Sequence, residues 1–154
     1  MINDIWPLIE KELPDLHLYI IGSNASKNLL SLRNQNIEVL GFVEDPKDIF
    51  LKYRISVAPL RYGAGMKGKV IDSMRYGVPC VISPVAAEGS GLENNHNVLI
   101  ANSPKEFAQN IVRLYNDRSL WETLAKNGID YCKKTISTDA ISKNIDLMLD
   151  KLAL

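Results

Sequence analysis

An excess of charge of one sign is missing from this sequence, because 18 lysine and arginine residues balance 18 aspartate and glutamate residues. A formal net charge of zero provides no broad electrostatic field of the kind that attracts nucleic acid or an anionic membrane. Nucleic acid is therefore not an expected partner. Any anion-binding role has to come from a local cluster of cations.

Cysteines and long apolar runs are also scarce. Only Cys80 and Cys132 are present, and without a CxxC spacing they predict buried thiols of a reducing compartment rather than a disulfide or a metal pair. No apolar run approaches the roughly 20 residues of a membrane span. The first six residues, MINDIW, lack the basic and apolar regions of a signal peptide. These features predict a cytoplasmic protein, either free or held peripherally at the inner face of the membrane.

Five short apolar runs alternate with segments of helical periodicity along the 154 residues. The runs are apolar on both alternating faces, which is typical of parallel strands covered by helices on both sides. They cover residues 16–22, 37–41, 55–60, 80–83 and 97–101. A chain of this length forms one substantial core. The pattern therefore predicts an α/β fold with a doubly wound parallel sheet, in a single domain over residues 1–154.

Capping signals mark the starts of two predicted helices. Asp45 followed by Pro46 is typical of an N-cap with proline in the first turn, and it predicts a helix to about residue 53. Ser103 and Glu106 form a capping box. The helix behind the box has apolar residues at helical spacing, namely Phe107, Ile111 and Leu114.

The two ends of the chain are predicted to be helical. From residue 119 onwards we expect helices to the end, with breaks near 127–128 and 137–138, and a further helix over 69–76. The chain opens with an apolar helical segment over residues 2–9, whereas a doubly wound domain usually starts on a strand. We therefore expect the first strand to be missing. The sheet edge exposed in this way would favour self-association.

Residues 59–70, PLRYGAGMKGKV, carry the most informative chemistry. They follow a predicted strand and open a predicted helix, at the edge where α/β sheets bind ligands. Three glycines allow backbone N–H groups to approach a ligand, and the helix N-terminus adds partial positive charge. The loop also concentrates three cations within nine residues, namely Arg61, Lys67 and Lys69. These features predict a diphosphate site, with a glycine-rich turn and solvated lysines as the alternative.

Two familiar glycine patterns also match this loop. A GxGxxG run begins at Gly63, but the dinucleotide fingerprint normally follows the first strand of a domain, and Glu88, about twenty residues on, lies beyond the next strand. A P-loop match ends in Val70, which lacks the hydroxyl that binds Mg²⁺. Both patterns therefore favour a dehydrogenase or an NTPase only weakly.

The run GAGMKGKVIDSMRYGVPCVIS, with GFVED upstream and AAEGSGL downstream, resembles the donor-binding half of group 1, family-4-type glycosyltransferases. The resemblance extends from about residue 6 to about residue 134. It implies the Rossmann-like C-terminal half of a GT-B fold, which binds a UDP- or GDP-sugar for transfer to a glycan or lipid-linked acceptor. It further implies retention of anomeric configuration, no metal or other cofactor, a role in polysaccharide biosynthesis, and an acceptor domain that the chain does not contain.

The hallmark of this family is two glutamates separated by seven residues. The first of these positions is Ala64 here, which alters the expected sugar contact and leaves the stereochemical outcome open, and the second is Asp72. The resemblance implies that Asp72 accepts hydrogen bonds from the ribose. The alternative is an acid in the first turn of a helix, favoured by the helix dipole.

The resemblance also implies that Phe42 and Val43 lie beside the nucleobase, although Phe42 fits a core position equally well. Glu88 is either a ligand contact or a loop acid. The residues expected to bind the nucleotide sugar are Phe42, Val43, Arg61, Gly63, Gly65, Met66, Lys67, Gly68, Lys69, Asp72 and Glu88.

The expected function is thus the donor-binding part of a glycosyltransferase that is inactive as an isolated chain. The alternative is a non-catalytic nucleotide-binding or interaction module, a remnant of such an enzyme. A second domain encoded with the chain would favour the enzyme.

Overall fold

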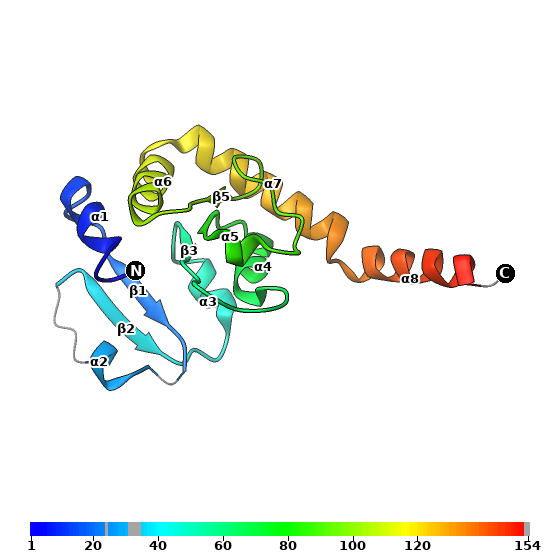
Figure 1. Cartoon of the computed structure of the whole chain (residues 1–154), viewed down its shortest axis with the longest axis horizontal. Coiled ribbons are helices and arrows are strands. Elements are labelled where there is room, and N and C mark those ends of the chain that lie inside the picture. Colours follow the sequence, from blue (N-terminus) through cyan, green and yellow to red (C-terminus); the bar gives the residue numbers. More distant parts are fainter. Residues whose placement is uncertain (24, 31–34, 153–154) are drawn as a thin grey trace.

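The computed structural model describes residues 1–23, 25–30 and 35–152, which form parallel strands and helices in alternation (Figure 1). The strands are β1 (Leu18–Ile21), β2 (Ile37–Gly41), β3 (Ser56–Ala58), β4 (Cys80–Ile82) and β5 (Leu99–Ile100). Each neighbouring pair is parallel, in the order β1-β2 in one sheet and β3-β4-β5 in a second. All five strands lie within the predicted runs, and the α/β class with parallel strands is confirmed.

Eight helices are present in the described part of the chain. They are α1 (Trp6–Glu12), α2 (Lys27–Leu30), α3 (Pro46–Phe50), α4 (Gly68–Arg75), α5 (Pro84–Ala87), α6 (Pro104–Asn116), α7 (Arg118–Thr135) and α8 (Thr138–Leu152). Helix α1 packs on α6 and α4 packs on α7, whereas α8 extends away from the body of the molecule (Figure 1). None of the helices described is long and apolar enough to cross a membrane.

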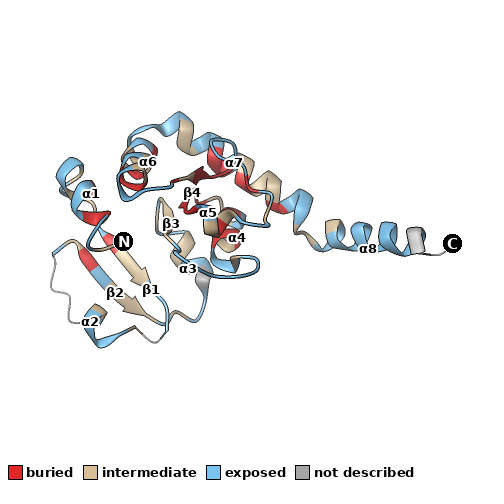
Figure 2. Cartoon of the chain, in the orientation of Figure 1, coloured by how far each residue is buried: buried red, intermediate tan, exposed pale blue. Residues whose placement is uncertain are grey.

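Strand β4 lies in the middle of the three-stranded sheet and is buried on both faces (Figure 2). Val81 belongs to one hydrophobic cluster, and Cys80 and Ile82 belong to another. Because successive side chains of a strand point to opposite faces, the two clusters lie on opposite sides of the sheet. The prediction of a sheet covered on both faces is therefore confirmed for this strand.

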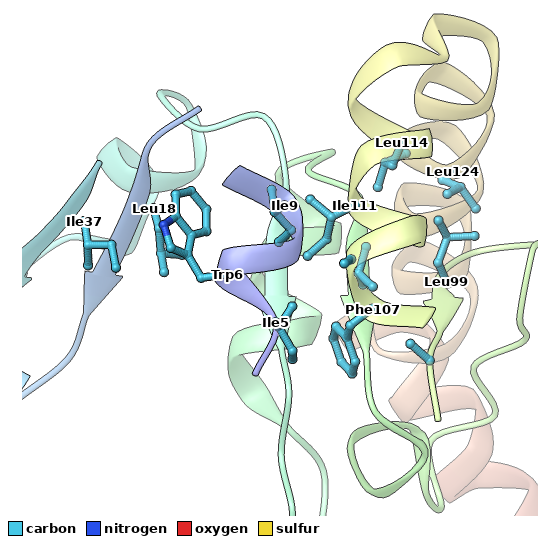
Figure 3. Close-up of a cluster of buried hydrophobic side chains, with 13 residues drawn as sticks. Ile5, Trp6, Ile9, Leu18, Ile37, Leu99, Phe107, Ile111, Leu114 and Leu124 are labelled. Atoms are coloured by element: carbon cyan, nitrogen blue, oxygen red, sulfur yellow. The ribbon is translucent and has the colours of Figure 1, made fainter. Parts of the chain in front are cut away.

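The first cluster lies between strands β1, β2, β4 and β5 on one side and helices α1 and α6 on the other (Figure 3). The opening segment contributes its three buried apolar residues, namely Ile5, directly before α1, and Trp6 and Ile9 of α1. The predicted stripe on α6 supplies the facing side chains, and all three are buried, namely Phe107, Ile111 and Leu114. The apolar residues at the start of the chain thus pack against the sheet and are shielded from solvent.

The predicted N-cap hydrogen bonds are present at two helices, although the capping box at Ser103 is not closed as predicted. The Asp45 carboxylate accepts a hydrogen bond from the Lys47 N–H at 2.8 Å, although α3 ends at Phe50, earlier than predicted. The Ser103 hydroxyl accepts from the Glu106 N–H at 3.2 Å. The Glu106 carboxylate reaches back one residue further than a capping box requires, to the N–H of Asn102 at 2.7 Å.

The expected break near residues 127–128 is wrong, because α7 runs unbroken through Gly128. This glycine is buried against α4: a Cβ added to it would lie 3.4 Å from the Met74 Cβ. The glycine therefore allows close helix packing instead of ending a helix. The second expected break is confirmed, since α7 ends at Thr135 and α8 begins at Thr138.

Candidate functional site

The glycine-rich loop connects the carboxyl end of β3 to α4, as predicted. Its start is fixed to the neighbouring strand by Ser83, whose hydroxyl donates to the Leu60 carbonyl oxygen at 2.7 Å and whose N–H donates to the Ala58 carbonyl oxygen at 3.1 Å. The sequence-based interpretation missed Ser83. The available signal was a small hydroxyl residue directly after a buried strand.

The path of the loop requires a glycine at residue 65, where φ is 71°. In this left-handed region a side chain is strained. The Lys67 ammonium folds back over the loop and donates to the Gly65 carbonyl oxygen at 2.6 Å. A Cβ on Gly63 would lie 3.5 Å from Lys67 Cε. The Lys67 side chain therefore packs across the loop and does not extend into solvent.

Helix α4 begins without a side-chain cap. The N–H groups of Val70 and Ile71 donate to the Lys67 carbonyl oxygen at 2.9 and 3.3 Å. The N–H groups of Gly68 and Lys69 have no helical carbonyl before them, so they remain available to a ligand. An uncapped helix N-terminus beside two lysines is a suitable place for an anion.

A cavity of about 600 Å³ opens near the start of this helix. At the carboxyl ends of β1 and β2 it is lined by Gly22, Ser23, Phe42 and Val43, and from α4 it is lined by Lys69. The Phe42 side chain is 74% exposed, so its alternative assignment to the core is wrong. The cavity therefore brings the predicted base-binding and phosphate-binding segments together.

Eight other predicted site residues do not line this cavity, namely Arg61, Gly63, Gly65, Met66, Lys67, Gly68, Asp72 and Glu88. Arg61 makes an exposed ion pair with Asp4 at 3.2 Å, a contact that contributes little on the surface and that the sequence did not reveal. Glu88 is exposed directly after α5, and Lys67 is held by the loop. Of the two lysines of the predicted diphosphate site, Lys69 lines the cavity and Lys67 does not.

Asp72 is half-buried on α4 and lies beyond the first turn, which contains no acidic residue. The alternative explanation by the helix dipole is therefore weakened, because that effect declines within the first turn. Burial chiefly raises the pKa of the Cys132 thiol; the Arg75 charge lowers this pKa, and the smaller effect of the Asp72 charge raises it. The sequence also predicts that residues 22–24, which follow the first predicted strand, border the site; Gly22 and Ser23 line the cavity, and Asn24 lies outside the described residues.

Aromatic side chains also line the cavity. The rings of Tyr19 and Tyr53 approach to 4.4 Å between centroids, and both residues face the cavity. Burial, followed by the neighbouring Tyr19, raises the pKa of Tyr53. Tyr53 is therefore a neutral phenol at physiological pH, and it contributes an uncharged wall.

The model of one protein family, described as glycosyl transferases of group 1, matches residues 1–117 of this sequence. The chain belongs to this family. Two curated relatives are an uncharacterized 44.6 kDa protein in the cps region of Klebsiella pneumoniae, 26% identical over 94% of the chain, and the capsular polysaccharide biosynthesis glycosyltransferase CapM of Staphylococcus aureus, 24% identical over 87% of the chain. The chain spans only 39% and 37% of the length of these two relatives.

A similar solved structure is that of Anabaena HepE in complex with UDP and glucose. It is 16% identical, with a TM-score of 0.76, over 96% of this chain and 45% of HepE. This likeness shows that the group 1 glycosyl transferase chain has the fold of part of a GT-B enzyme, in agreement with the resemblance read from its loop.

Proposed function

We propose that this chain is the donor-binding domain of a glycosyltransferase and that it binds a UDP- or GDP-sugar. The observation that carries the proposal is the shared cavity, because Lys69 at the start of α4 lines it together with Phe42 and Val43 at the end of β2. A cation and free N–H groups on one side and a partly apolar wall on the other match a diphosphate joined to a base.

The diphosphate is proposed to bind at the uncapped N-terminus of α4. The N–H groups of Gly68 and Lys69 donate to phosphate oxygens, and the Lys69 ammonium neutralises part of their charge. Arg61 and Lys67 are close in sequence and supply further positive charge. Release of Lys67 from the Gly65 carbonyl oxygen would let it contact the ligand.

The nucleoside is proposed to lie towards β2. The exposed ring of Phe42 offers a surface for the base, and backbone atoms of Phe42 and Val43 offer hydrogen bonds to its edge. Asp72 is proposed to accept hydrogen bonds from the ribose hydroxyls. Glu88, at the end of the neighbouring α5, is proposed to contact the sugar side of the donor.

In the proposed reaction the bond between the anomeric carbon and the diphosphate breaks, and an acceptor hydroxyl oxygen forms the new bond to that carbon and passes its proton to an oxygen of the leaving diphosphate. Negative charge then accumulates on the leaving diphosphate. Lysines, an arginine and a helix N-terminus stabilise such charge in the way that a divalent metal does elsewhere. We therefore propose transfer without a metal, with retention of configuration, to a glycan or lipid-linked acceptor.

Names of similar proteins support the substrate class. HepE was solved with UDP and glucose, and CapM is described as an enzyme of capsular polysaccharide biosynthesis. Because this chain spans less than two fifths of the CapM length, we propose that the acceptor is held by a further domain.

Saturation-transfer NMR tests the proposal on the chain as it stands. UDP- and GDP-sugars, UDP, GDP, uridine and guanosine are compared at equal concentration, with and without EDTA. We expect saturation at base and ribose protons, stronger binding of the diphosphates than of the nucleosides, and no effect of EDTA. A folded chain that binds none of these compounds would overturn the proposal.

A further inference from the structure

The glycine-rich loop has an exposed middle between two ends. Residues 61–66 are all exposed. The downstream end is held by α4, which buries Val70 and Ile71 in the second hydrophobic cluster. The position of the exposed residues therefore depends on how the upstream end, at Leu60, is held.

Both backbone groups of Leu60 are hydrogen-bonded. Its N–H donates to the Ala58 carbonyl oxygen at 2.9 Å, and its carbonyl oxygen accepts from the Ser83 hydroxyl at 2.7 Å. These two bonds fix the direction in which the chain leaves β3. The ion pair of Arg61 with Asp4 joins exposed side chains, and a pair of this kind holds a loop only weakly.

Ser83 is a rigid partner for the start of the loop. It directly follows β4, the central strand of the three-stranded sheet, and it is only 7% exposed. Its N–H donates to the Ala58 carbonyl oxygen at 3.1 Å, which continues the pairing of β3 with β4. The sheet therefore holds the backbone that carries this hydroxyl.

The Ser83 hydroxyl donates and accepts at the same time. It accepts a hydrogen bond from the Ala86 N–H at 3.3 Å and so caps α5. Because a backbone carbonyl oxygen can only accept and a backbone N–H can only donate, the single hydroxyl proton has to point to Leu60. One hydroxyl group therefore joins the start of the glycine-rich loop to the start of α5.

Helix α5 is also held at its other end, where Glu88 follows it. The Ser90 hydroxyl donates to the Ala87 carbonyl oxygen at 2.5 Å, and the Tyr131 hydroxyl of α7 donates to the Ser90 carbonyl oxygen. The short helix is thus tied to the sheet at one end and to α7 at the other. Through Ser83, the glycine-rich loop is bonded to this fixed segment.

We propose that Ser83 is a positioning residue of the donor site, whose hydroxyl holds the glycine-rich loop so that its cations lie beside the start of α4, where the diphosphate binds. The inference rests on the proposed function, in which Arg61 and Lys67 add positive charge there. Lys67 follows the loop because its ammonium is bonded to the Gly65 carbonyl oxygen. Hydrogen bonds to phosphate depend on distance and angle, so a loop that leaves β3 in several directions binds the diphosphate less well.

The test measures diphosphate and nucleoside binding separately. Calorimetry on the full chain and on Ser83→Ala compares UDP with uridine and GDP with guanosine. We expect diphosphate affinity of Ser83→Ala to fall about tenfold, because the loop loses a hydrogen bond at its start. Nucleoside affinity should change by less than about twofold, because a nucleoside lacks the phosphates that the loop contacts. Equal losses for both, or no loss for either, would overturn the proposal.

Further variants separate positioning from stability. Ser83→Thr keeps the hydroxyl and should restore diphosphate binding. Ser103→Ala is the matched control, since the Ser103 hydroxyl caps α6 in the same way, accepting from the Glu106 N–H at 3.2 Å. Its loss lowers stability and should leave the ratio of diphosphate to nucleoside affinity unchanged. The same change of ratio in Ser103→Ala would assign the effect to general destabilisation and overturn the proposal.

A measurement without ligand checks the loop directly. Order parameters from NMR relaxation report its fast motion, and we expect those of residues 61–66 to fall in Ser83→Ala but not in Ser83→Thr or Ser103→Ala. Unchanged order in Ser83→Ala would overturn the proposal. Ser83→Cys, whose thiol is only a weak donor, replaces Ser83→Ala if that variant does not fold, with the same losses expected.

Failure of this inference can be told apart from failure of the proposed function. An unaltered chain that binds neither diphosphate better than its nucleoside would reject the proposed function, and this inference with it. An unaltered chain that prefers the diphosphate by a factor that Ser83→Ala retains would reject this inference alone.

Discussion

Gly128 and Met74 meet where α7 crosses α4: a Cβ at position 128 would lie 3.4 Å from the Met74 Cβ and 3.6 Å from its Cε. Both residues are buried. Because residue 128 has no side chain, α7 can lie close to α4, the helix that begins at the glycine-rich loop.

Substitutions at Gly128 test this contact. We expect Gly128→Ala to change the free energy of unfolding by less than about 0.5 kcal/mol, because the gain in helix propensity of about 1 kcal/mol offsets a tight contact. Gly128→Val adds methyl groups that meet Met74 and should lower stability by about 1–3 kcal/mol. Urea unfolding measures both. Equal stability of the two variants would show that the helices can separate without loss.

Gly77 ends the turn after α4 with φ of 73°, and a Cβ there would lie 3.2 Å from Ile129 Cδ1. We expect Gly77→Ala to destabilise the chain by about 1–3 kcal/mol, from backbone strain together with this contact. Gly91→Ala is the matched control, since φ is 69° and nothing lies within 4 Å. Thermal unfolding should show a larger loss for Gly77→Ala, and the excess should disappear in an Ile129→Val background.

Removal of the loop cations should weaken donor binding. We expect Lys69→Ala, and also Lys67→Ala, to reduce UDP or GDP affinity roughly ten- to a hundredfold, because each removes a charge-assisted hydrogen bond. Affinity for the bare nucleoside should fall much less. Lys126→Ala, an exposed residue of α7, is the control. Calorimetry that finds equal losses for nucleoside and diphosphate would place these lysines away from the phosphates.

We expect the isolated chain to bind donor nucleotide without transferring sugar. Transfer requires an acceptor oxygen held within about 3–3.5 Å of the anomeric carbon, in an enclosed site, and we have proposed that another domain supplies that enclosure. Purified chain is incubated with labelled nucleotide sugars and candidate glycan or lipid acceptors. Slow hydrolysis at most is expected, and robust formation of a glycosylated product would show that an acceptor site lies on this chain.

Thiol reactivity should depend on folding. Burial raises the pKa of Cys80 from 9.0 to about 11, so at pH 8 roughly one molecule in a thousand carries the reactive thiolate at this position. Burial also raises the pKa of Cys132. We expect both thiols to react slowly with a disulfide reagent in the native protein and rapidly in urea.

The same shift predicts a pH dependence of stability. A group whose pKa is raised by folding stabilises the native state below its unfolded pKa, and the contribution of Cys80 is therefore lost as the pH rises from about 9 towards about 11. Cys80→Ser should reduce this alkaline loss. Denaturation midpoints measured across this window check the prediction, and an unchanged slope in the variant would contradict it.

Local signals in the sequence predicted local features of the structure. Ser103 and Asp45 were predicted as caps because a cap depends on residues two or three positions apart. The break at Gly128 was predicted wrongly because a glycine that serves helix packing looks the same in sequence as one that ends a helix. What decides between them is Met74, which lies far away in the chain.

In the candidate site, too, local features were predictable from the sequence and contacts between distant residues were not. The fold and the order of the loop were predictable because strand, glycines and helix follow each other in the chain. Contacts between distant segments were not, including Ser83 with the Leu60 carbonyl oxygen and Arg61 with Asp4. The sequence also could not decide whether Phe42 lies in the core or at the surface, because its exposure depends on where other segments of the chain lie.

The absence of a backbone ladder between β1 and β3 has a consequence for cooperativity. Hydrogen bonds within each sheet hold β1 to β2 and β3 to β4, whereas side-chain packing, chiefly of α1 on α6, connects the two parts. Packing contacts of this kind can separate without breaking a ladder, so the β1–β2 part is a natural unit of partial unfolding. Separation of the β1–β2 part should therefore cost less free energy than unfolding of the sheet that contains β4. Unfolding of the molecule should then depart from a single two-state transition.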